Sequence, residues 1–149
     1  MTDSEVKIFI DCLTGFFGSV SGTDASSGVP YVKNEGESVL LNYTGVIGIS
    51  GKRKGCLYIT CDRDMLADCV SIFLGEEQPS EIAIKDMVGE IANTVAGNAR
   101  ESFGMEFLIS VPIIINGKPK NVELPLEIPT YVIPINWKQY QSFLVVGIE

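Results

Sequence analysis

The segment Asp86-Met-Val-Gly-Glu90-Ile-Ala-Asn93-Thr-Val-Ala-Gly97-Asn98 carries the clearest helical pattern in this chain. At about 100° per residue, with Asp86 as the origin, Glu90 falls at about 40°, Asn93 at about 340° and Gly97 at about 20°. A second set, at roughly 100° to 200°, forms the expected buried side: Ile84, Met87, Val88, Ile91, Val95 and Ser102. The segment therefore predicts a long amphipathic helix whose polar stripe faces away from the core.

The polar stripe combines two carboxylates, one amide and a glycine. A glycine inside a helix costs about 1 kcal/mol relative to alanine, and Gly97 would contribute no core packing on this side. Close approach of another protein surface would explain the glycine. We therefore expect Gly97 to bind a partner, while Asp86 either helps in docking or lies in solvent one turn before Glu90.

Two other interpretations of the stripe remain open. Charged stripes on amphipathic helices are usually only solvated. Asp86, Glu90 and Asn93 could also bind Mg²⁺, because hard cations prefer oxygen ligands. Asn98 differs, since it falls at about 120°, on the apolar side. We expect it to be a buried structural amide that braces the helix through hydrogen bonds.

The composition limits the classes of function. The chain has 149 residues and a net charge of −8, from 19 acidic and 11 basic residues. This acidic balance argues against binding to nucleic acid or to anionic membranes. The longest apolar run, residues 111–115, is far short of a bilayer span, and the first residues lack a signal-peptide pattern. We expect one domain over residues 1–149 in a cytoplasmic protein with protein or small-molecule partners.

The absence of histidine excludes several kinds of site. A Ser-His-Asp or Cys-His hydrolase is impossible, and a general base near neutral pH would have to be a carboxylate, lysine or cysteine with a shifted pKa. The four cysteines, Cys12, Cys56, Cys61 and Cys69, form no Cys-x-x-Cys pair. A zinc site is not expected, and we interpret the cysteines as reduced, mostly buried thiols.

Local patterns predict the remaining elements. Residues 4–17 form an amphipathic helix with Ser4 or Asp3 as cap and Gly18 as stop. Residues 18–38 form a loop with a possible short strand at 29–32, which Pro30 confines to an edge. Residues 39–49 and 55–60 form a hairpin with a basic turn.

Two more helices and three strands follow. Asp62 caps a helix whose apolar face, including Phe73 and Leu74, ends at Gly75. Ser80 caps the stripe helix and Gly104 ends it. Strands follow at 106–115, 130–135 and 142–148, with a proline-rich connection between the first two. Strands that precede and follow a helix pair along the sequence indicate an α+β fold with an antiparallel-rich sheet.

The spacing Asp-x3-Glu-x2-Asn, with Gly-Asn four residues after the amide, resembles the motif of the CheC, CheX and FliY chemotaxis phosphatases. Here the motif comprises Asp86, Glu90, Asn93, Gly97 and Asn98. With one such motif in 149 residues, the chain is most similar to a single CheX-like domain. The resemblance implies a CheC-like fold, in which a six-stranded sheet carries its long helices on one side.

The resemblance also implies a function. CheX-like proteins dephosphorylate the phosphoaspartate of receiver domains such as CheY, and a homodimer is possible, as in CheX. In this interpretation Asn93 positions the hydrolytic water and Glu90 binds the receiver lysine. The chain itself needs no cofactor, because Mg²⁺ is expected on the receiver domain.

Three other functions remain open. The first is a non-catalytic module that binds a receiver or a flagellar protein through the same fold. The second is a metal-dependent hydrolase, which the missing histidine disfavours. The third is a structural dimerisation domain in which the polar stripe only solvates a helix.

Overall fold

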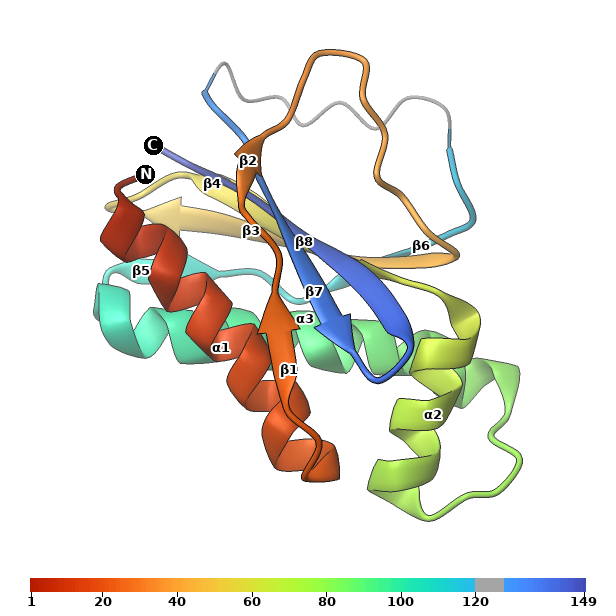
Figure 1. Cartoon of the computed structure of the whole chain (residues 1–149). Helices are drawn as coiled ribbons and strands as arrows, with labels where there is room; N and C mark the ends of the chain where they lie inside the picture. The colour runs from red at the N-terminus through yellow and green to blue at the C-terminus, as the bar shows by residue number, and fades with distance from the viewer. Residues whose placement is uncertain (120–127) are drawn as a thin grey trace.

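Helices cover one face of an antiparallel sheet in the computed structural model, which describes residues 1–119 and 128–149 (Figure 1). The three helices of the described residues are α1 (Asp3–Ser21), α2 (Arg63–Leu74) and α3 (Glu81–Phe103). The strands are β1 (Ala25–Ser27), β2 (Tyr31–Val32), β3 (Tyr43–Gly51), β4 (Gly55–Cys61), β5 (Phe107–Ile109), β6 (Ile113–Asn116), β7 (Tyr131–Trp137) and β8 (Tyr140–Ile148). The predicted α+β class is confirmed.

The strand order explains how eight strands form a sheet that is six strands wide. The order is β1-β7-β8-β4-β3-β5, and every pairing is antiparallel. β2 continues the β1 edge along β7, and β6 continues the β5 edge along β3. The resemblance implied six strands, whereas the sheet has eight, because each of its two edge positions is divided between two short strands.

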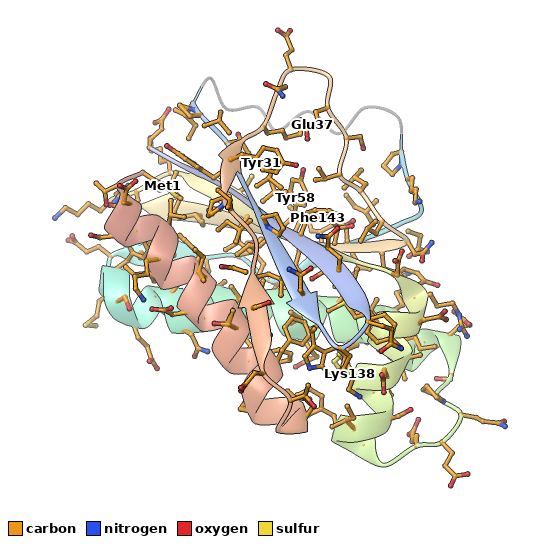
Figure 2. The ribbon with its side chains drawn as sticks, viewed as in Figure 1. Met1, Tyr31, Glu37, Tyr58, Lys138 and Phe143 are labelled. Atoms are coloured by element: carbon orange, nitrogen blue, oxygen red, sulfur yellow. The ribbon has the colours of Figure 1, made fainter. Side chains whose placement is uncertain are left out.

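The two faces of the sheet bury different clusters because strand side chains alternate in direction. In β4, Leu57 and Ile59 join the large core beneath the helices, whereas Tyr58 belongs to a smaller cluster on the opposite face. Leu40, Val132 and Val145 complete that smaller cluster, and Phe143 packs against it. Figure 2 shows Tyr58 and Phe143 close together, near Tyr31 and Glu37. The segment before β3 thus covers the face that the helices leave free.

Helix α1 is longer than the sequence predicted. Thr2, not Ser4 or Asp3, caps it: the Thr2 hydroxyl accepts from the Glu5 N–H at 3.2 Å, and the Glu5 carboxylate accepts from the Thr2 N–H at 3.1 Å. The helix passes Gly18 and ends at Gly22, whose φ of 65° is left-handed. Tertiary contact sustains the extra turn, because the Trp137 indole N–H donates to the Ser21 hydroxyl at 2.9 Å.

Other boundaries also differ from the predictions. Pro112 interrupts the predicted strand 106–115, leaving β5 and β6 as separate strands on β3. Asp62 lies at the cap of α2 without a side-chain hydrogen bond, and the Asn42 amide oxygen accepts from the Arg63 N–H instead, at 2.8 Å. Ser80, Gly75 and Gly104 lie at the predicted helix ends. Part of the proline-rich connection lies outside the described residues.

Helix α3 lies directly against β3 because small residues meet at the contact. A Cβ at Gly45 would come within 2.7 Å of the Val88 carbonyl oxygen and 3.1 Å of the Ala92 methyl group. Both Val88 and Ala92 are fully buried. Because Gly45 has no side chain, α3 can lie this close to the sheet. The position of the outer face of α3 therefore depends on a glycine at this position.

We therefore expect Gly45→Ala to lower the free energy of unfolding by about 1–3 kcal/mol, the usual cost of overpacking. Urea denaturation of the purified variant measures this change. Gly15→Ala is the matched control, because Gly15 lies inside α1 with nothing within 4 Å of its added Cβ. That variant should gain up to about 1 kcal/mol from helix propensity. Equal stability of Gly45→Ala and wild type would contradict the proposed contact.

Within residues 1–119 and 128–149, none of the helices combines the length and apolar character that crossing a membrane requires.

Candidate functional site

The N-terminal end of α3 is fixed by a cap and an ion pair. The Ser80 hydroxyl accepts from the Ala83 N–H at 3.1 Å. Arg63 donates its Nε–H to Glu81 Oε1 at 2.6 Å, and the Tyr43 hydroxyl donates to Glu81 Oε2 at 3.1 Å. The Arg63 guanidinium lowers the pKa of Glu81. These contacts join the start of α3 to both α2 and β3.

Aromatic packing fixes the other end of α3. The Phe103 ring stacks on Phe107 of β5 with centroids 4.7 Å apart, and it packs against Phe9 of α1 at 5.7 Å. The Arg53 guanidinium lies 5.6 Å from the centroid of the same Phe103 ring. With both ends held, α3 is a rigid support for the side chains between them.

The predicted polar stripe lies on the outer face of α3. Asp86, Glu90 and Asn93 are exposed, and Gly97 is half-buried with open space where a Cβ would be. Within the described part of the chain, the Asp86, Glu90 and Asn93 side chains form no hydrogen bond or ion pair. The helix thus brings these four residues onto one face, where their polar groups are available to a partner.

The structure corrects the predicted position of Asn98. Asn98 is exposed rather than buried, and Ser102 is exposed as well. The buried arc of α3 is rotated toward Gly89 and Ala96, since these small residues allow the helix to lie close to the sheet. The apolar side of the wheel was therefore centred too close to Asn98. The prediction that Asn98 is a buried amide that braces the helix is therefore wrong.

Gly89 has a structural explanation. It is buried, and an added Cβ would lie 3.2 Å from Ile114 and 3.6 Å from Pro112, both beside or within β6. Of the two glycines inside α3, only Gly97 faces open space. The partner-binding prediction therefore rests on Gly97.

The described residues near the stripe provide no additional ligands for a metal ion. Among the described residues, no three His, Cys, Asp or Glu side chains lie close enough together to hold a metal ion. Asp86 and Glu90 supply two carboxylates, and Asn93 could add only an amide oxygen. Burial raises the pKa of the Cys61 thiol well above its usual range and that of Cys69 to about 12, which disfavours the thiolates that bind metals.

An apolar groove beside the stripe was not anticipated from the sequence. It has a volume of about 580 Å³ and lies between the last turns of α1 and α2 and the first half of α3. The sequence predicted Phe73 and Leu74 as part of the apolar face of α2, but they are 47% and 61% exposed and line this groove. The sequence offered one signal of this exposure: both residues lie just before Gly75, in the final turn of the helix. A final helical turn often extends beyond the elements that it packs against.

Comparison with known proteins places this arrangement in a family. The sequence matches the family model described as chemotaxis phosphatase CheX over residues 43–136. No curated protein sequence matches the chain significantly.

Solved structures of chemotaxis proteins share the fold over almost the whole chain. The CheX protein of Desulfovibrio desulfuricans is 25% identical with a TM-score of 0.85, over 98% of this chain and 99% of that one. A CheC-like protein from Shewanella sp. PV-4 is 24% identical with a TM-score of 0.85, over 100% and 99%. A chain in the CheX–CheY–BeF3–Mg²⁺ complex of Borrelia burgdorferi is 18% identical with a TM-score of 0.78, over 97% of each chain.

Proposed function

This chain belongs to the CheX family of chemotaxis phosphatases, and we propose that it hydrolyses the phosphoaspartate of a CheY-like receiver domain. The observation that carries the proposal is the outer face of α3. Glu90 and Asn93 lie there one turn apart, exposed and free of hydrogen bonds and ion pairs within the described part of the chain. The Borrelia relative that forms a complex with CheY, BeF3 and Mg²⁺ supports a receiver domain as the partner.

The reaction needs little from the phosphatase. An acyl phosphate is already reactive, and the receiver supplies Mg²⁺ and a lysine. The water oxygen bonds to phosphorus as the bond to the aspartyl oxygen breaks, and the products are inorganic phosphate and a free carboxylate. Catalysis then consists of holding the water in line with the breaking bond.

Asn93 suits this task because its amide provides a donor and an acceptor on one plane. It can accept a hydrogen bond from the attacking water and donate one to a neighbouring oxygen without changing its own protonation. We assign it the catalytic role. Glu90, one turn earlier on α3, pairs with the receiver lysine and fixes the two proteins in register. A hundredfold acceleration requires only about 2.7 kcal/mol.

The test is the decay of phosphate on a purified receiver with Mg²⁺ at saturation. A panel of CheY-like receivers is phosphorylated with a small phosphodonor, and the decay is followed with and without this protein. A faster first-order decay of at least one receiver is expected. Binding without faster decay would instead identify a non-catalytic receiver-binding module, and neither binding nor decay across the panel would refute the proposal.

Gly97 tests whether a partner surface lies against the stripe. Gly97→Leu adds a side chain where nothing lies within 4 Å, so the free protein should gain about 0.8 kcal/mol from helix propensity. Docking should be blocked sterically. We expect a raised melting temperature together with lost phosphatase activity. An active variant, or a destabilised one, would show that Gly97 does not face the receiver.

The proposed mechanism also predicts a flat pH profile. The chain has no histidine, and burial raises the pKa of Cys56 to about 11 and of Cys69 to about 12, as well as raising the pKa of Cys12 and Cys61. A thiol with a raised pKa stays protonated below it, so neither imidazole nor thiolate can act as a base between about pH 6 and 8. Asn93 does not ionise.

The ratio of stimulated to intrinsic dephosphorylation should therefore change by no more than about twofold between pH 6 and 8. Taking the ratio removes the pH dependence of the receiver itself. An inflection near neutrality would point to a titrating carboxylate as general base and would contradict positioning by an amide.

A further inference from the structure

The apolar groove lies directly beside the proposed receiver-binding face. Its lining residues come from α1, α2 and the first half of α3. The large apolar side chains that line it are Phe16, Val20, Phe73, Leu74 and Met87. The rings of Phe16 and Phe73 pack with centroids 5.6 Å apart and hold the α1 and α2 walls together. The groove is therefore a formed feature of the fold.

The exposure of this lining has no explanation in the isolated chain. Phe73 is 47% exposed and Leu74 is 61% exposed, although Cys69 and Val70, about one turn earlier in α2, belong to the main core. Adjacent large apolar side chains left in contact with water are typical of an interaction surface. Burial against another apolar side chain would remove this area from water.

The groove is continuous with the stripe, because Asp86 and Glu90 line both. A receiver whose lysine contacts Glu90 must place part of its surface over this opening. The interface that we propose for catalysis thus extends to the ends of α1 and α2.

The rim of the groove is electrostatically negative. Besides Asp86 and Glu90, the C-terminal ends of α1 and α2 meet here, and neither helix has a basic residue in its last turn. A helix C-terminus carries partial negative charge on its free carbonyl groups. The exposed Glu76 and Glu77 follow the cap residue Gly75, two and three positions after the groove-lining Leu74. An apolar floor within a negative rim fits an apolar side chain that has a lysine or arginine beside it.

We infer that the groove binds an apolar side chain flanked by a basic residue on the surface of the receiver domain, next to its phosphoaspartate. This inference rests on the proposed function and adds a specificity surface to it. The groove selects and holds the receiver, while Asn93 acts on the water. Changes in the groove should therefore alter receiver affinity without altering the rate of the bound complex.

Leu74→Lys tests the inference, because it removes apolar surface and places a positive charge against the basic residue of the receiver. The probe is the CheY-like receiver on which the wild-type protein acts, carrying beryllofluoride and Mg²⁺. Titration calorimetry should show an affinity at least roughly tenfold weaker than wild type. At saturating receiver, the dephosphorylation rate should stay near that of wild type.

Two further variants make the result specific. Val29→Lys is the matched control, since Val29 is 85% exposed and lies between β1 and β2, outside the groove; it should bind within about twofold of wild type. Leu74→Ser removes the apolar surface without adding charge and should bind with intermediate affinity. It also replaces Leu74→Lys if that variant fails to fold by circular dichroism.

Three outcomes would overturn the inference. Unchanged affinity of both Leu74 variants would show that the receiver does not use the groove. A reduced rate at saturating receiver would assign Leu74 to catalysis. A wild-type dimer that Leu74→Lys dissociates in ultracentrifugation, with receiver affinity unchanged, would identify a second copy as the occupant. Failure of the proposed function is distinct, since the wild-type protein would then act on no receiver.

Discussion

Asn93→Ala is expected to abolish most of the acceleration of receiver dephosphorylation while leaving the fold and the receiver affinity nearly intact. The Asn93 side chain is exposed on α3 and has no hydrogen bond within the described part of the chain. Its truncation therefore removes no contact from the folded protein. Alanine also has the higher helix propensity, so stability should rise by a few tenths of a kcal/mol, on the order of 0.5.

The predicted loss is kinetic because the amide is proposed to act only when the water attacks. If the wild-type protein accelerates dephosphorylation about a hundredfold, the variant should lose most of about 2.7 kcal/mol of transition-state stabilisation. The rate at saturating receiver measures this loss, and titration with the beryllofluoride-bound receiver measures affinity separately.

Asn98→Ala provides the matched control. Asn98 is a second exposed asparagine on α3, five residues further along and off the stripe. Its truncation removes the same group from the same helix, so its rate should remain near that of wild type. Equal dephosphorylation rates for Asn93→Ala and wild type would contradict the proposed catalytic role of Asn93. A comparable loss in both variants would mean that the amides act through the helix and not at the reacting phosphoryl group.

The sequence was sufficient for the features that depend on local chemistry. Ser80 and Gly104 delimit α3 as predicted, because a capping hydroxyl and a helix-terminating glycine act within a few residues of themselves. The exposure of Asp86, Glu90 and Asn93 followed from helical periodicity alone. These predictions needed no knowledge of what the helix packs against.

Features set by tertiary contact could not be predicted in the same way. The helical wheel placed Asn98 inside because the expected buried set included Ser102 and left out the glycine and alanines of α3 that are buried. The contact of Gly45 with Val88 instead rotates the buried arc toward these small residues. The extra turn of α1 depends on a hydrogen bond between Ser21 and Trp137, which are 116 positions apart.

The apolar groove was missed for a related reason. Helical spacing identifies Phe73 as part of the apolar face of α2, but it cannot show where the neighbouring elements end. Only the assembled fold leaves Phe73 and Leu74 partly uncovered beside Glu90. The residues proposed to act were therefore predictable from sequence, and the surface proposed to choose their partner was not.

Glu90→Lys is expected to weaken both receiver binding and turnover, because it sets an ammonium group against the receiver lysine that Glu90 is proposed to meet. Opposed like charges at an interface cost several kcal/mol, so affinity for the beryllofluoride-bound receiver should fall by roughly a hundredfold or more. Glu90 is exposed and forms no ion pair within the described residues. The free variant should therefore fold normally.

The control must separate this local effect from the change in net charge. Glu35→Lys makes the same change of two units, and exposed Glu35 lies in the segment between β2 and β3, away from α3. It should bind the receiver almost as wild type does. Raising the salt concentration screens charges in solvent more than charges enclosed in an interface, so the Glu35 effect should vanish while most of the Glu90 effect persists. If Glu90→Lys binds as tightly as Glu35→Lys, Glu90 is a solvated residue, and the receiver must be held in register by other contacts.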